Sequence, residues 1–109
     1  MKPVTFIGDS LDAIRDFPAL AKNEAGLQLA RVQQGLDPGD WKPMNSIGSG
    51  VRELRARDPA GAFEATTIAA LPDAAYVLHA FQKKTQKTAQ CDLAIATRRL
   101  IQIVRSTTQ

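Results

Sequence analysis

The chain has 109 residues, 44% of them hydrophobic and 23% charged, a composition typical of one small soluble domain spanning residues 1–109. A single cysteine and a single histidine exclude an internal disulfide and a Cys/His metal centre, and no stretch approaches the roughly 18 apolar residues of a membrane span, so a cytoplasmic protein without a membrane partner is expected. Residues 1–50 carry five Lys/Arg against six Asp/Glu (net −1) and residues 51–109 carry nine against five (net +4), so positive charge is concentrated in the second half.

The first third of the chain predicts a short strand followed by two helices. Residues 4–7 alternate apolar and polar side chains, and Asp9 or Ser10 can then cap a short helix that Pro18 closes. A longer helix over residues 19–34 is predicted next, with Gly35 suited to end it. Its apolar residues recur at steps of three or four: Ala21, Ala25, Leu29, Val32 and Leu36.

The middle of the chain begins with a loop-rich stretch. Within residues 41–50 a short strand is predicted around 44–47, and a longer strand follows over 51–57. The next residues, 58–61, read as a tight turn, because proline fixes φ there and glycine is free to take a positive φ.

Residues 63–70 are ambiguous, because their Ala and Glu favour helix whereas Thr66, Thr67 and Ile68 favour strand. The flanking turns and the strand-like residues 75–82 decide in favour of a strand. We therefore expect a β-meander covered by the helix over 19–34.

A final amphipathic helix is predicted after Thr88, which is placed to cap it. Its apolar residues recur at steps of three or four: Leu93, Ala96, Leu100 and Ile103. This order of elements predicts an α+β domain with a mostly antiparallel sheet and the helices packed on one face.

Basic residues gather where the last strand meets the last helix. Three lysines lie there within five residues, Lys83, Lys84 and Lys87, and the strand over 51–57 places Arg55 and Arg57 on one face by alternation. Such a junction suits a phosphate ligand, although a solvated basic rim and RNA binding without catalysis remain open. His79 lies in an apolar strand and is expected to be a hydrogen-bonded structural residue.

Three runs of sequence resemble a known toxin family. They are Val-Arg-Glu-Leu-Arg at 51–55, Gly-Ala-Phe at 61–63 and Tyr-Val-Leu-His-Ala-Phe-Gln-Lys-Lys-Thr-Gln-Lys-Thr at 76–88. With the Trp-Lys-Pro piece at 41–43, they resemble the phage-derived, HigB-like branch of the RelE/ParE toxin superfamily over nearly the whole chain. The resemblance implies a RelE-like α+β fold, with a mostly antiparallel twisted sheet, two N-terminal helices and one C-terminal helix.

The same resemblance implies the toxin of a type II toxin–antitoxin system, an endoribonuclease that cleaves mRNA on the ribosome by metal-independent attack of the ribose 2′-OH. Its partners would be mRNA and a cognate helix-turn-helix antitoxin of the HigA/XRE type, and no cofactor is needed. Carried over position by position, the phosphate-stabilising set is Lys84 with Lys83 and Lys87. The residues expected to bind the RNA backbone are Arg52, Arg55 and Arg57.

One catalytic position departs from the family pattern. Relatives carry Phe/Tyr-Arg-Val-Ile-Tyr after the glycine turn, with a catalytic arginine, whereas this chain has Glu64 at that place. Reversing a charge beside a phosphate is worth several kcal/mol at an effective ε of about 20. Two alternatives to an active enzyme therefore stay open: an attenuated toxin homologue that keeps antitoxin binding, and a plain RNA-binding domain.

Overall fold

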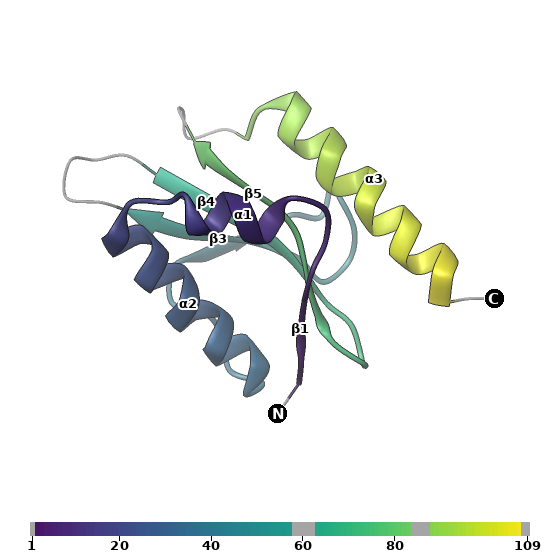
Figure 1. Cartoon of the computed structure of the whole chain (residues 1–109). Helices are drawn as coiled ribbons and strands as arrows, with labels where there is room; N and C mark the ends of the chain where they lie inside the picture. The colour runs from purple at the N-terminus through teal and green to yellow at the C-terminus, as the bar shows by residue number, and fades with distance from the viewer. Residues whose placement is uncertain (1, 58–62, 84–87, 108–109) are drawn as a thin grey trace.

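The computed structural model describes residues 2–57, 63–83 and 88–107 and shows an α+β fold with a five-stranded sheet. Two helices follow the first strand and a third ends the described chain (Figure 1). In chain order the elements are β1 (Val4–Phe6), α1 (Ser10–Arg15), α2 (Ala19–Gln33), β2 (Trp41–Pro43), β3 (Val51–Arg57), β4 (Phe63–Ala70), β5 (Ala75–Lys83) and α3 (Gln90–Thr107). The predicted fold class is thereby confirmed.

The sheet has the order β1-β5-β4-β3-β2 and is antiparallel except where β1 pairs with β5. The predicted meander is its centre, and the ambiguous segment is indeed a strand, β4. Thr66 and Thr67, which favoured that interpretation, are buried there between β3 and β5. Both neighbouring strands supply hydrogen bonds along β4, so pairing outweighs the helix propensity of its alanines.

The helices cover both faces of the sheet, which corrects the expectation that they share one. One core cluster joins α1 and α2 to residues such as Leu54 and Val77, whereas another joins α3 to Val51 and Leu78. Consecutive residues of a strand point to opposite faces, so Val77 and Leu78 belong to opposite layers. None of the helices in the described ranges is long and apolar enough to cross a membrane.

The short strand before β3 lies at Trp41–Pro43 and not at 44–47 as predicted. Trp41 stands opposite Leu54 in the register with β3, and the backbone N–H of Met44 donates to Val51 O at 2.8 Å. Residues 44–47 then turn, with Ile47 N donating to Met44 O at 3.0 Å. The connection back to Val51 is short, so these residues must reverse the chain and cannot extend the strand.

Helix α2 ends at Gln33, and Gly35 closes it two residues later in a Schellman arrangement, the role predicted for this glycine. Gly35 has φ +80°, and the N–H groups of Gly35 and Leu36 donate to the carbonyls of Val32 and Arg31. The buried stripe of α2 stops at Val32, and Leu36 is exposed because it follows this reversal. The expected stripe was therefore one residue too long.

Asp9 precedes α1, but its side chain makes no capping hydrogen bond. It instead accepts a bond of 3.0 Å from Arg99 of α3, and this bond is the main reason that the pKa of Asp9 lies below its usual value. Arg99 also donates to Leu78 O at 2.8 Å. Gly8 makes this contact possible, because it has φ +58° and a Cβ there would stand 2.6 Å from the guanidinium. Arg99 thus ties α3 to β5 and to the start of α1.

Candidate functional site

A buried carboxylate, Glu53 of β3, organises one end of the sheet. Its side chain is fully buried and accepts a hydrogen bond of 2.8 Å from Lys83 Nζ and another of 2.6 Å from Thr88 Oγ1. Lys42 of β2, its partner in the sheet register, places Nζ 3.7 Å from the same carboxylate. Glu53 therefore joins β2, the end of β5 and Thr88, which lies two residues before α3.

The charges around Glu53 are strongly coupled. Burial alone would raise the pKa of its carboxyl, but the hydrogen bonds from Lys83 and Thr88, together with the charges of Lys83 and Lys42, hold that pKa below its usual value. The pKa of Lys42 is lowered, first by burial and then by the charges of Lys83 and Arg55, against the opposing effect of Glu53. Glu53 is thus ionised at neutral pH, and Lys42 gives up its proton more readily than a free lysine.

Two of the predicted arginines share a face, as alternation along β3 requires. Arg55 and Arg57 both lie near the carboxylate of Asp40, with Nε to oxygen distances of 3.9 and 3.4 Å. Arg52 lies on the other face, 3.4 Å from Asp37 and 4.5 Å above the ring of Trp41. The structure therefore groups Arg55 with Arg57 and places Arg52 apart from them.

The predicted lysines divide between the described and undescribed parts of the chain. Lys83 is described, and its side chain is only 3% exposed because the ammonium is directed inward to Glu53. Lys84 and Lys87 lie outside the described residues. The backbone of Glu64 pairs with Ala56 and Gln82 inside the sheet, and its side chain also lies outside the description.

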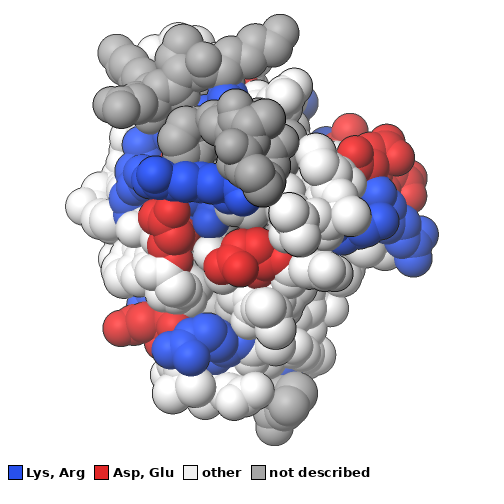
Figure 2. Space-filling view, turned by 90° about the vertical axis from the view of Figure 1, so that its left-hand side faces the viewer, with Lys and Arg blue, Asp and Glu red and all other residues white. Residues whose placement is uncertain are grey.

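Together, the described charged residues at this end of the sheet form a basic cluster: Lys42, Arg55, Arg57 and Lys83, with the carboxylates Asp40 and Glu53. Four cations against two carboxylates leave a net charge of 4 − 2 = +2. Figure 2 shows Lys and Arg surface on one face of the molecule, with acidic patches next to it. The lysine-bearing segment 84–87 begins after one member of the cluster, Lys83, and ends before Thr88, which Glu53 also binds.

Sequence reasoning missed Glu53 and Lys42 as members of this cluster. Thr88 was expected to cap α3, but its hydroxyl binds Glu53 and the helix begins later, with Asp92 N and Leu93 N donating to Ala89 O. A signal for Glu53 existed, because alternation places it on the face of Val51, which is buried. A carboxylate on a buried face requires a cation nearby.

His79 is a buried, hydrogen-bonded residue, as expected. Its Nε2 lies 2.7 Å from Asp92 Oδ1, and its ring stacks on Phe81 with 5.0 Å between centroids. Cys91 is exposed on the first turn of α3. In the described ranges, no group of three metal-binding side chains comes together.

The basic cluster favours an anionic ligand bound by lysine and arginine.

A family model described as "Phage derived protein Gp49-like (DUF891)" matches residues 12–101, which include α2, the whole sheet apart from β1, and most of α3. No curated protein gives a significant sequence match to the chain.

Proposed function

Because the chain belongs to the Gp49-like family of phage-derived proteins, within the RelE/HigB-like toxins, we propose that it is the toxin of a type II toxin–antitoxin system and cleaves mRNA on the ribosome. A helix-turn-helix antitoxin of the HigA/XRE type would neutralise it. The toxin family and the basic cluster support this proposal together, since neither the fold nor positive charge alone specifies a reaction.

The proposed reaction needs no metal. The ribose 2′-oxygen forms a bond to the adjacent phosphorus, the bond from phosphorus to the 5′-oxygen breaks, and the products are a 2′,3′-cyclic phosphate and a 5′-hydroxyl. One group must take the proton from the 2′-OH, another must protonate the leaving 5′-oxygen, and cations must stabilise the charge that develops on phosphate. Lysines and arginines can supply all three requirements.

In this scheme Lys84 and Lys87 bind the scissile phosphate, and Arg55 and Arg57 bind the RNA backbone. Lys83 balances the charge of Glu53. Lys42 suits proton transfer, because its side chain is one-third exposed and its pKa is lowered by burial and by the cations beside it. Arg52, on the other face of β3, would contact only RNA that extends around the edge of the sheet.

The observation that carries the proposal is the binding of Glu53 to both Lys83 and Thr88. These two residues flank the lysine segment 84–87, so one buried carboxylate fixes the points at which that segment leaves the sheet and enters the approach to α3. Fixed ends raise the affinity of a segment for phosphate, because the segment then loses fewer conformations when the ligand binds.

Glu64 favours a second candidate, an attenuated toxin homologue that retains antitoxin binding. A carboxylate at the position of the family's arginine would repel RNA phosphate and reduce cleavage. A plain RNA-binding domain would need only the basic cluster.

Expression of the chain without an antitoxin tests these alternatives. An active toxin arrests growth and produces mRNA cuts that depend on translation, and a Lys84→Ala/Lys87→Ala variant loses both effects. If growth and mRNA are unaffected while a helix-turn-helix protein co-purifies, the chain is an attenuated homologue. RNA binding without either result identifies a plain RNA-binding domain.

A further inference from the structure

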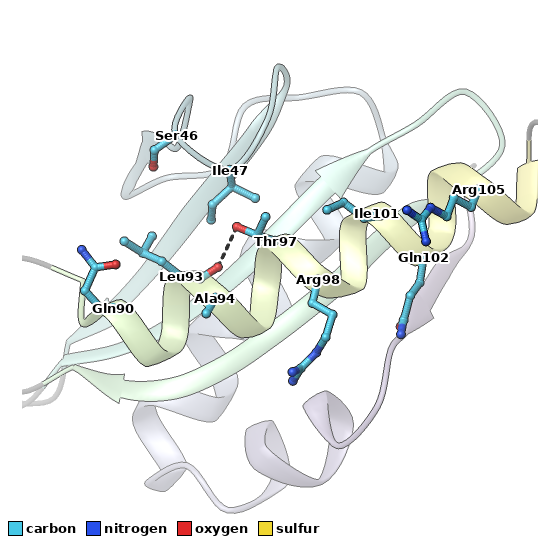
Figure 3. Close-up of a pocket in the computed structure, with 10 residues that line it drawn as sticks. All are labelled: Ser46, Ile47, Gln90, Leu93, Ala94, Thr97, Arg98, Ile101, Gln102 and Arg105. Carbon is cyan, nitrogen blue, oxygen red and sulfur yellow. Dashed lines mark hydrogen bonds between the residues drawn. The ribbon is translucent and has the colours of Figure 1, made fainter.

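A second surface, separate from the basic cluster, lies along the outer side of α3. It is a groove of about 730 Å³ between α3 and the loop that joins β2 to β3. Figure 3 shows Leu93, Thr97 and Ile101 along the side of α3 nearest Ile47, with Arg98 projecting from the adjacent side of the helix. The groove therefore has an aliphatic floor beside a basic border.

The groove exposes a large aliphatic side chain beside arginines. Ile101 is 46% exposed, although it is a large hydrophobic residue. Arg98 and Arg105 both line the groove, and none of the described residues that line it is acidic. Within the described ranges, Arg98 has no hydrogen-bond or ion-pair partner. The groove thus offers apolar contact together with positive charge that a partner can neutralise.

The spacing of these side chains fits a helix as the occupant. Arg98 and Arg105 are seven residues apart, which on α3 is about two turns or 10.5 Å. Acidic residues seven apart on a second helix have the same separation when the two helices pack side by side. Leu93, Thr97 and Ile101 recur every four residues, as the ridge of a helix that receives another helix does.

Two other occupants fit less well. No aromatic side chain lines the groove in the part of the chain described, whereas single-stranded RNA is commonly held by stacking on aromatic rings. A second copy of this chain, related by a two-fold axis, would bring the same arginines toward one another, and like charges would oppose the contact.

We propose that this groove binds an acidic amphipathic helix of a protein partner, with an aliphatic residue of that helix seated on Ile101 and acidic residues two turns apart paired with Arg98 and Arg105. That the partner is the neutralising antitoxin rests on the proposed function; the chemistry of the groove does not.

Two synthetic helical peptides of about 15 residues test the groove directly. Both peptides carry the same leucines on their apolar face. One has glutamates two turns apart and the other has lysines at the same positions. Fluorescence polarisation measures the binding of each peptide to the full chain. We expect the glutamate peptide to bind at least about tenfold more tightly, with an advantage that shrinks at high salt. Equal binding of both peptides, or no binding of either, would overturn the proposal.

Variants of the protein locate the contact. Ile101→Asp and Arg98→Glu should each weaken binding of the glutamate peptide by about tenfold or more. Leu27→Asp is the matched control, because Leu27 is 64% exposed on α2, across the sheet from α3, and should leave binding unchanged. An equal loss in the control, displacement of the peptide by a short RNA, or self-association that depends on Ile101 would each contradict the assignment.

The same variants separate this inference from the proposed ribonuclease. Ile101→Asp and Arg98→Glu should retain the mRNA cleavage of the unmodified chain, since neither residue belongs to the basic cluster. Peptide binding in a chain that never cleaves RNA would remove the proposed function and keep the groove. Cleavage of mRNA by a chain that binds neither peptide would keep the proposed ribonuclease and remove the groove as a binding site.

Discussion

Replacing Glu53 with glutamine tests the role of the buried carboxylate most directly. The change keeps the size of the side chain but leaves the Lys83 ammonium, only 3% exposed, without its counter-charge. Breaking a buried ion pair by removing one partner typically costs about 3–5 kcal/mol, and Lys42, 3.7 Å from Glu53 and one-third exposed, adds little to this because water can screen it. We therefore expect Glu53→Gln to reduce the free energy of unfolding by about 3–4 kcal/mol.

Urea unfolding at pH 7, followed by circular dichroism, measures this loss for Glu53→Gln, Lys83→Met and the double variant. The double variant should recover about 2 kcal/mol or more relative to the sum of the single changes, because it removes both buried charges. Asp40→Asn is the matched control, since Asp40 is 41% exposed and its pairs with Arg55 and Arg57 should contribute less than about 1 kcal/mol. A cost below about 1 kcal/mol for Glu53→Gln, or strict additivity in the double variant, would refute the reasoning.

Three further outcomes are expected. Because the folded-state pKa of Glu53 is lowered, its stabilising effect should be complete above the unfolded-state value of about 4.5 and should fade as the pH falls through the folded-state value, so that urea titrations of the native chain and Glu53→Gln converge in acid. RNA affinity should fall with salt, with a slope in log K of about −0.7 per contacted phosphate, and filter binding should give a shallower slope for Lys84→Ala/Lys87→Ala. Glu64→Arg should raise translation-dependent mRNA cleavage by about a hundredfold or more, as primer extension would show, and equal growth arrest by both forms would mean that Glu64 does not occupy the catalytic position.

Most of the fold could be predicted because the signals for it are local. Glycine and proline mark the turns, and the bracketing of residues 63–70 by turn sequences outweighed their mixed propensities. The stripe of α3 correctly identified its inward side, with Ala96 and Ile103 buried. It could not identify the face of the sheet that α3 covers, because a helix stripe shows which side of the helix is buried and carries no information on the layer against it.

The buried part of the site could not be predicted in the same way. Glu53 binds Lys83 and Thr88, which lie 30 and 35 residues away in sequence. Such contacts depend on the pairing of β5 within the sheet and on where the start of α3 packs against it. Alternation placed Arg55 and Arg57 together because that relation lies within one strand. The lysine run predicted a phosphate-stabilising set of Lys84 with Lys83 and Lys87, whereas the structure buries the Lys83 side chain and directs its ammonium inward to Glu53.

Under the proposed function, the ion pairs within the basic cluster limit how much of its positive charge is available to an RNA phosphate. Glu53 already balances Lys83, and Asp40 is shared by Arg55 and Arg57, so the described residues leave an excess of two positive charges. One of these belongs to Lys42, whose lowered pKa makes it the cation most easily neutralised as the pH rises. A further carboxylate near the phosphate would cancel half of this excess. If the proposed function holds, cleavage by the chain as it stands would therefore depend chiefly on Lys84 and Lys87, which add two positive charges to the sequence.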